Sequence, residues 1–240
     1  MRHFELIRFA NDQELADSVS RRWWSELEAR GGGRGNYTVA LSGGRIAGRL
    51  FSTLAELARD KSEVLQAVHW FWGDERCVPP GDPESNFGLA QRLLLQALSV
   101  PEGRVHRIRG EELPATAAAM AEAELRSVAS AGAGNQPVLD LIFLGMGEDG
   151  HVASLFPTEP ESMVNDAAVF RAVVGTKPPP NRITIGYQTI AAAREVWVLA
   201  SGAGKEQALR ESTKQASQTP LARVLRLRSQ TTVFTDVSLT

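Results

Sequence analysis

Apolar residues recur along the chain with two different periods, which predict a succession of helices and strands. Apolar residues three to four positions apart predict helices over 12–30, 45–58, 85–98, 115–130 and 205–212. Short apolar runs between turn residues predict strands over 37–41, 67–72, 139–144, 169–174, 182–186, 195–200 and 231–235. The alternation of nearly continuous apolar strands with helices predicts an α/β fold, an open, mostly parallel twisted sheet with helices on both faces in a Rossmann-like arrangement.

The composition is that of an ordinary globular protein. The chain has 240 residues, with 26 Lys and Arg against 28 Asp and Glu, and 43% of its residues are hydrophobic. This length suits one α/β body, and we find no convincing linker, so a single domain over residues 1–240 is expected. The balanced charge leaves no basic footprint for duplex nucleic acid, so a small molecule is the expected partner of a monomer or small homo-oligomer.

Neither a membrane segment nor a disulfide framework is predicted. The longest apolar run, Val138 to Met146, is far shorter than the roughly 20 residues that span a bilayer, and the first residues lack an apolar signal core. Cys77 is the single cysteine, which excludes an intrachain disulfide and fits a reducing compartment. We therefore expect a cytoplasmic protein in which Cys77 is a structural thiol.

The loops that follow strands are the places to seek a site, because ligands of open parallel sheets bind beyond the carboxyl ends of the strands. The first is Ser42-Gly43-Gly44-Arg45, which leads into a predicted helix. Two glycines let backbone N–H groups approach an anion, and the helix points its positive end at the same place. The loop is either a phosphate cradle or simply a strand-to-helix turn that favours Ser and Gly.

The second loop, Gly73 to Arg76, follows an aromatic strand and carries two carboxylates and a guanidinium. Asp74 and its neighbours can supply an acid or base with an anion clamp, or they can form an internal ion pair that closes the loop. Ser85 and Asn86 open the next helix, where Ser85 is most simply the N-cap.

The third loop, Gly145 to His151, contains the pattern Gly-x-Gly-x-x-Gly. Pro157 follows too soon for the long helix of a dinucleotide-binding unit, so we interpret that match as accidental. Asp149 and His151 lie two residues apart just past a buried strand, the spacing of a general base with its orienting carboxylate, although a structural role is the alternative.

Cationic residues also stand at the ends of later elements. Lys177 precedes three prolines, Arg182 opens a strand and Lys205 opens a helix. Gly204-Lys205 lacks the spacing of a nucleotide-binding Walker A loop. These residues either converge on one anion or are solvated surface charges.

The chain shows no cysteine and histidine set with zinc spacing, no Gly-x-Ser-x-Gly elbow and no metal-binding carboxylate loop. No metal and no cofactor are therefore expected. The residues alone indicate a parallel-sheet protein with anion-binding loops and one Asp-x-His pair, suited to a small phosphorylated substrate and proton transfer.

In their order along the chain, these pieces resemble the 6-phosphogluconolactonase family, within the larger group that includes the glucosamine-6-phosphate deaminases. The matching stretches are Leu41-Ser-Gly-Gly44, Trp72-Gly-Asp-Glu-Arg76, Ser85-Asn86, Gly145-Met-Gly-Glu-Asp-Gly-His151-Val-Ala-Ser-Leu-Phe-Pro157, Pro179-Pro-Asn-Arg-Ile-Thr184 and Trp197 to Lys205. The deaminases typically continue Asp-Gly-His with Phe-Asn-Glu-Pro and have Asp-Glu-Tyr at the second loop. This chain has Ala-Ser-Leu-Phe-Pro and Asp-Glu-Arg, which favour the lactonase.

The resemblance implies hydrolysis of 6-phospho-D-glucono-1,5-lactone to 6-phospho-D-gluconate in the oxidative pentose phosphate pathway, without a cofactor. It assigns to His151 the role of general base and acid that activates water, and to Asp149 a supporting role. It makes Arg76, Arg182 and Lys205 candidates for binding the phosphate.

By the same resemblance, the backbone of Gly43-Gly44 lies beside the phosphate, Ser42 and Asn86 contribute to substrate binding, and Asp74 faces the sugar. One departure concerns Arg45, because the family commonly has hydroxyl residues after Ser-Gly-Gly. Arg45 is expected to replace the hydroxyl with a charge-assisted contact, or else to point to solvent.

Two other functions remain as alternatives to the lactonase. A glucosamine-6-phosphate deaminase or isomerase would release ammonia or a ketose from an aldose phosphate. A non-enzymatic sugar-phosphate sensor would bind 6-phosphogluconate without turnover, and such sensors usually carry a DNA-binding domain for which this length leaves no room.

Overall fold

The computed structural model describes residues 4–30, 36–59 and 61–238. Its centre is a sheet of six parallel strands in the order β1-β11-β10-β7-β2-β3. The strands are β1 (Glu5–Arg8), β2 (Tyr37–Leu41), β3 (Val68–Trp72), β7 (Leu141–Gly145), β10 (Glu195–Ala200) and β11 (Thr232–Thr235). The predicted α/β fold with its parallel sheet is confirmed.

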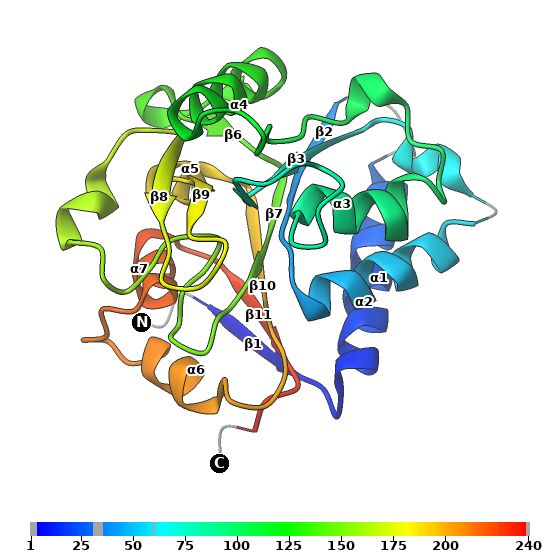
Figure 1. Cartoon of the computed structure of the whole chain (residues 1–240). Helices are drawn as coiled ribbons and strands as arrows, with labels where there is room; N and C mark the ends of the chain where they lie inside the picture. Colours follow the sequence, from blue (N-terminus) through cyan, green and yellow to red (C-terminus); the bar gives the residue numbers. More distant parts are fainter. Residues whose placement is uncertain (1–3, 31–35, 60, 239–240) are drawn as a thin grey trace.

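Helices cover both faces of this sheet (Figure 1). They are α1 (Asp12–Ala29), α2 (Arg45–Leu57), α3 (Asn86–Ala90), α4 (Pro114–Val128), α5 (Tyr187–Ala192), α6 (Glu206–Ser212) and α7 (Pro220–Leu227). In Figure 1, α1, α2 and α3 lie on one side of the sheet and α5, α6 and α7 on the other. Helix α1 begins where the Asn11 side chain accepts a hydrogen bond from the Glu14 N–H at 2.9 Å, and its apolar face buries Leu15, Val19 and Trp23.

The core between α1 and the sheet is dominated by large aromatic side chains. The ring of Trp23 meets Trp70 of β3 edge-on at 5.6 Å and Phe143 of β7 at 5.3 Å, and Phe143 meets Trp197 of β10 at 5.7 Å. Edge-to-face pairs of this kind stabilise a core by about 0.5–1.5 kcal/mol each beyond the area that they bury. The sheet and α1 therefore form a rigid base for the loops at the strand ends.

The order of the strands reverses direction between β2 and β7. The chain passes from β2 outward to β3, and from β7 in the opposite direction to β10 and β11. Loops that leave two such neighbouring strands diverge and leave a crevice, which is the usual ligand site of open α/β sheets. Here a hydrogen bond joins the two loops across the crevice: the N–H of Gly145 after β7 donates to the Ser42 hydroxyl after β2 at 3.2 Å.

Two predicted strands do not join the parallel sheet. β8 (Phe170–Val174) and β9 (Asn181–Ile185) form a separate antiparallel sheet with β4 (Asp74–Arg76), in the order β4-β9-β8, and α4 packs against it. The apolar pattern of these strands predicts burial but does not specify a partner strand. The short connection between β8 and β9 favours an antiparallel pair, because a parallel pair needs a crossover of a dozen or more residues.

The helix predicted over 85–98 is only partly α-helical. It consists of α3 followed by a π-helical turn over Gln91–Leu95, in which the Gln96 N–H donates to the Gln91 carbonyl at 3.1 Å. Strand β1, strand β4 and helices α5 and α7 were not predicted, because segments of three to eight residues carry too little periodicity. A short hairpin of β5 (Ser130–Ala131) with β6 (Pro137–Val138) completes the described strands.

No helix within the described ranges combines the length and the apolar character needed to cross a bilayer.

Candidate active site

The loops after β2, β3, β7 and β10 enclose a hollow of about 360 Å³. The predicted site residues that line it are Ser42, Gly43, Gly44, Arg45, Asp74, Arg76, Asn86, His151, Arg182 and Lys205. Asp149, the remaining predicted site residue, lies behind His151 and contacts its ring. The structure thus brings together residues that are more than 160 positions apart in the sequence.

His151 is held by Asp149 through both its ring and its backbone. The ring Nδ1 lies 2.6 Å from Asp149 Oδ1, and the His151 N–H donates to the same oxygen at 3.1 Å. A carboxylate only accepts, so Nδ1 carries the proton of the neutral ring and Nε2 keeps its lone pair. The hydrogen bond from His151 lowers the pKa of Asp149 to about 2. Asp149 is therefore anionic throughout the neutral range, as a group that orients an imidazole and balances its charge must be.

The loop that carries this pair depends on glycine at one position. A Cβ at Gly147 would stand 2.1 Å from the Nδ1 and Cε1 atoms of His151. Only glycine lets the loop fold back closely enough for the Gly147 N–H to donate to the His151 carbonyl at 2.9 Å. No helix begins directly after the last glycine, since residues 151–160 contain no helical turn, so the Gly-x-Gly-x-x-Gly pattern lacks the helix of a dinucleotide fingerprint.

The glycine turn after β2 opens the N-terminus of α2 toward the hollow. Gly44 is the N-cap, at φ +90°, and no side chain caps the helix. A Cβ at Gly43 would overlap the Asn86 amide, at 1.8 Å from its Oδ1, so the turn and Asn86 fit only with glycine there. The uncapped N–H groups of this 13-residue helix suit an anion.

Asp74 is almost fully buried and is held by two donors. The Ser154 hydroxyl donates to Asp74 Oδ2 at 2.7 Å, and the Asn86 amide donates to Oδ1 at 3.1 Å. Ser154 belongs to the loop that follows His151, and sequence reasoning gave it no role. The only signal was its place in the matching stretch after Asp-Gly-His. Asp74 therefore ties the loop after β3 to the loop after β7.

Arg76 and Arg182 stand directly opposite each other in the antiparallel pairing of β4 with β9. Arg182 donates to the carbonyls of Pro179 and Lys177 at 3.1 and 3.4 Å, and Arg76 donates to the carbonyl of Glu84 at 2.6 Å. Burial, and next the charge of Arg76, lower the pKa of Arg182. Two like charges brought this close repel each other, and an anionic ligand would relieve the repulsion.

Lys205 and Arg45 are two further cationic residues that line the hollow. Within the described residues, the ammonium of Lys205 has no hydrogen bond or ion pair, and burial followed by the charge of Arg45 lowers its pKa. Arg45 Nη1 lies 2.9 Å from Asp12 Oδ2, while its other terminal nitrogen packs against Gly202. Arg45 is 63% exposed on its side chain, and it is one of the residues that line the hollow.

Glu75 holds neighbouring site residues in place through hydrogen bonds, a role that was not predicted from the sequence. Its buried carboxylate accepts four hydrogen bonds, from the Ser85 hydroxyl at 3.0 Å and from the N–H groups of Asn86, Phe87 and Arg76 at 2.8 Å each. Burial raises the pKa of Glu75 despite these donors. The Glu75 side chain thereby joins β4 to the start of α3 and sets the positions of Arg76 and Asn86.

The described residues contain no group of three or more histidine, cysteine or acidic side chains placed to hold a metal ion. Fold and site together define an α/β protein in which a histidine–aspartate pair faces a cationic hollow at the carboxyl ends of parallel strands. The chain belongs to the family described as glucosamine-6-phosphate isomerases/6-phosphogluconolactonase, whose model matches residues 10–234.

Individual relatives within this family are proteins named 6-phosphogluconolactonase. The one from Streptomyces coelicolor is 35% identical over 212 residues, covering 85% of this chain and 81% of its own. The one from Haemophilus influenzae is 38% identical over 211 residues and covers 85% and 84%. The solved 6-phosphogluconolactonase of Trypanosoma brucei superposes with a TM-score of 0.81 at 28% identity, covering 96% of this chain and 94% of its own.

Proposed function

We propose that this chain is a 6-phosphogluconolactonase, which hydrolyses 6-phospho-D-glucono-1,5-lactone to 6-phospho-D-gluconate. The observation that most strongly supports this function is that the His151–Asp149 pair faces the same hollow as Arg45, Arg76 and Lys205. The two curated relatives described above have the corresponding name at 35% and 38% identity over most of the chain. A cationic hollow beside an acid–base histidine is what the hydrolysis of a phosphorylated lactone requires.

His151 is the acid–base group in this proposal. Its Nε2 takes a proton from water while the water oxygen bonds to the C1 carbonyl carbon, and the carbonyl electron pair moves to oxygen. When the tetrahedral intermediate collapses, the bond between C1 and the ring oxygen breaks, and the imidazolium returns the proton to that oxygen. Asp149 stabilises the imidazolium between these steps, because its carboxylate stays charged.

The phosphate is bound by the cationic wall. Arg76 and Arg182 supply paired guanidinium groups. Lys205 supplies an ammonium that makes no hydrogen bond or ion pair with a described residue, and the N-terminus of α2 supplies backbone N–H groups. Arg45 stands where the family commonly has a hydroxyl, and we assign it a charge-assisted contact to the phosphate. Its ion pair with Asp12 holds it at the rim.

The sugar is placed by the polar floor of the hollow. Asp74, Asn86 and Ser42 line it from the ends of β2 and β3 and from the start of α3. Asp74 faces the sugar hydroxyls with its orientation set by Ser154. We further propose that the enzyme acts in the cytoplasm, in the oxidative pentose phosphate pathway, and needs no cofactor, metal, membrane or nucleic acid.

The test generates 6-phosphogluconolactone in situ at neutral pH and follows 6-phosphogluconate with an excess of a coupled dehydrogenase, against the rate without protein. We expect clear acceleration by the protein and little acceleration with unphosphorylated glucono-1,5-lactone followed by acid release. A folded protein that leaves the uncatalysed rate unchanged would contradict the proposal, and ammonia release from glucosamine 6-phosphate would then be measured.

The phosphate contacts have a matched pair of variants. Lys205→Met removes a cation that has no internal partner in the described structure, so it should lower kcat/KM about 10–100-fold without harming the fold. Lys61→Met removes an exposed lysine outside the hollow and should change little. Equal activity of both variants would remove Lys205 from the phosphate site.

A further inference from the structure

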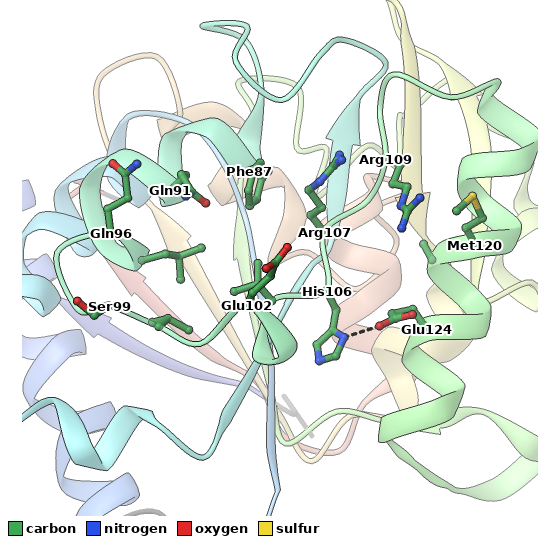
Figure 2. A pocket seen from close by; sticks show the side chains of 14 residues that line it. Phe87, Gln91, Gln96, Ser99, Glu102, His106, Arg107, Arg109, Met120 and Glu124 are labelled. Carbon is green, nitrogen blue, oxygen red and sulfur yellow. Dashed lines mark hydrogen bonds and ion pairs between the residues drawn. The ribbon is translucent and has the colours of Figure 1, made fainter.

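A second and larger hollow, of about 620 Å³, borders α3, whose Asn86 lines the hollow around His151 and whose Phe87 lines this one. Its residues come from α3 and the π-helical turn, from the chain between 99 and 109, and from α4. Figure 2 shows Gln91, Gln96 and Ser99 along one side and Met120 and Glu124 along the other. None of the residues that line it belongs to the hollow around His151.

Apolar side chains form one part of the lining of this hollow, and polar side chains form the rest. Leu95 and Ala121 are buried, and Phe87, Val100 and Val105 are partly buried and packed against the core. A planar or apolar body placed against these side chains would lose water from both surfaces, which favours binding. A pocket of this volume accepts a ligand larger than a phosphorylated hexose.

Several polar side chains on the rim have no hydrogen-bond or ion-pair partner among the described residues. Gln91, Gln96, Ser99, Glu102 and Arg109 make no side-chain hydrogen bond or ion pair with another described residue. Figure 2 shows these five side chains around one opening, with Glu102 near its middle. Unlike them, Glu124 is occupied, because it accepts from His106 Nδ1 at 2.7 Å. Two amides, a hydroxyl, a carboxylate and a guanidinium are thus available together.

The hollow carries charged side chains of both signs. Arg107 and Arg109 stand on the chain segment that approaches α4, and Arg107 is oriented by two bonds to Glu111 at 2.8 and 2.6 Å. The carboxylate of Glu102 lies near the middle of the opening in Figure 2, and the Arg107 guanidinium lies over the Phe87 ring, 5.6 Å from its centroid. This suits a ligand whose anionic end meets the arginines and whose hydroxyl groups meet Glu102.

The helix that borders the hollow has an independent irregularity. The π-helical turn Gln91–Leu95 widens the helix where Gln91 and Leu95 line the hollow. Turns of this kind are rare, cost hydrogen-bond geometry, and are found frequently at functional sites. The irregular turn therefore coincides with the unused polar groups.

We propose that this hollow is a binding site for a nucleoside monophosphate. The base lies against Phe87, Leu95 and Val105, the amides of Gln91 and Gln96 contact its edge, and the ribose hydroxyls donate to Glu102. The phosphate binds Arg109, with Arg107 beside it. This ligand combines a planar apolar face, a diol and a dianion, which correspond in kind to the apolar side chains, the carboxylate and the arginines of the lining.

The experiment titrates the whole chain with AMP, with adenosine and with inorganic phosphate, by calorimetry in a phosphate-free buffer. AMP is expected to bind with a dissociation constant of about 10⁻⁴ M or tighter, and more tightly than either component. Arg109→Gln and Glu102→Gln should each weaken AMP about tenfold, because each removes one charged contact. Arg59→Gln, which removes an exposed arginine outside both hollows, should leave the affinity unchanged.

Location is tested by amide chemical-shift mapping with AMP. Shifts are expected over 87–109 and 120–124, and AMP should bind Lys205→Met as tightly as the unmodified chain. Shifts confined to 42–45 and 145–151, or loss of AMP binding in Lys205→Met, would place the nucleotide in the active site and overturn the proposal. It also fails if AMP does not bind at millimolar concentrations, if phosphate alone binds as tightly, or if Arg109→Gln binds AMP normally.

Discussion

Among the described residues, two histidines are paired with a carboxylate, and they differ in what the second ring nitrogen contacts. His151 Nδ1 meets Asp149, while its Nε2 has no hydrogen-bond partner among the described residues. His106 Nδ1 meets Glu124 at 2.7 Å, while its Nε2 lies 2.8 Å from His69 Nδ1. Both rings therefore make the same contact with a carboxylate, but only His151 keeps an Nε2 lone pair that no described residue occupies.

The second network has one consistent placement of protons. Arg104 can only donate, and its contact with His69 Nε2 requires that nitrogen to accept. His69 Nδ1 then carries the proton and donates to His106 Nε2, and His106 Nδ1 donates to Glu124. Burial, and next the charge of Arg104, lower the pKa of His69 to about 4. The comparison teaches that a histidine–carboxylate pair is suited to acid–base catalysis only when the ring's other nitrogen faces a ligand.

The largest effect should come from replacing one histidine of each network. His151→Gln should lower kcat/KM for 6-phosphogluconolactone by about 10²–10⁴, because the general base is lost. His69→Gln should keep the rate within about twofold at pH 7.5, since glutamine can both accept from Arg104 and donate to His106. Circular dichroism and thermal unfolding verify that both variants fold. A fully active His151→Gln would refute the assignment of the general base.

The two networks should also separate in the pH dependence of stability. Because the pKa of His69 is lowered from 6.5 to about 4, the folded chain resists a proton that the unfolded chain accepts. The free energy of unfolding should therefore fall as pH decreases from 6.5 to 4, by up to about 3 kcal/mol. Denaturant titrations at several pH values should show a shallower fall for His69→Gln. Parallel curves for both proteins would contradict this origin.

A third effect concerns Asp149, whose carboxylate contacts the ring of His151. Asp149→Asn keeps an oxygen that can accept from His151 Nδ1 but removes the charge that stabilises the imidazolium. We expect kcat to fall about 10–100-fold with little change in KM. Since the pKa of Asp149 is about 2, its stabilising contact with His151 is complete above pH 4 and is lost only as the pH falls through 2. An unchanged kcat would leave Asp149 a purely structural role.

The smallest effect is expected from the carboxylate of the other network. Glu124→Gln retains an acceptor for His106, and the Glu124 side chain is 55% exposed. We expect the free energy of unfolding at pH 7.5 to change by less than about 1 kcal/mol, because exposed charged contacts contribute little. Chemical denaturation measures this change. A loss as large as that of a buried ion pair would show that the relay depends on the charge of Glu124.

The histidine–aspartate pair was open to prediction because it is local. His151 and Asp149 are two residues apart in one loop, so the strand that precedes them and the glycines around them are enough to place them together. The same holds for the glycine turn after β2, where the turn and the open helix N-terminus both follow from adjacent residues. Buried strands and long helices were also predicted well, because their periodicity extends over many positions.

Long-range contacts could not be predicted in the same way. Arg76 and Arg182 became neighbours through the antiparallel pairing of β4 with β9, and the apolar pattern of β9 predicts a strand but not its partner. Ser154 reaches Asp74 across 80 positions, and Glu75 collects donors from the start of α3. Each of these contacts depends on which surfaces pack together, and hydrophobic periodicity carries no information about that choice.

By itself, the sequence determined the α/β class, most of the helices and central strands, and the loops that carry the chemistry, because these follow from local periodicity and from residue types that tolerate tight turns. The tertiary structure alone decided that β8 and β9 form a second sheet. It also decided that Arg45, Arg76, Arg182 and Lys205 line the same hollow as His151, and that a second hollow borders α3. The physical reason is that distant segments meet only through packing and strand pairing, whose energy depends on the whole fold.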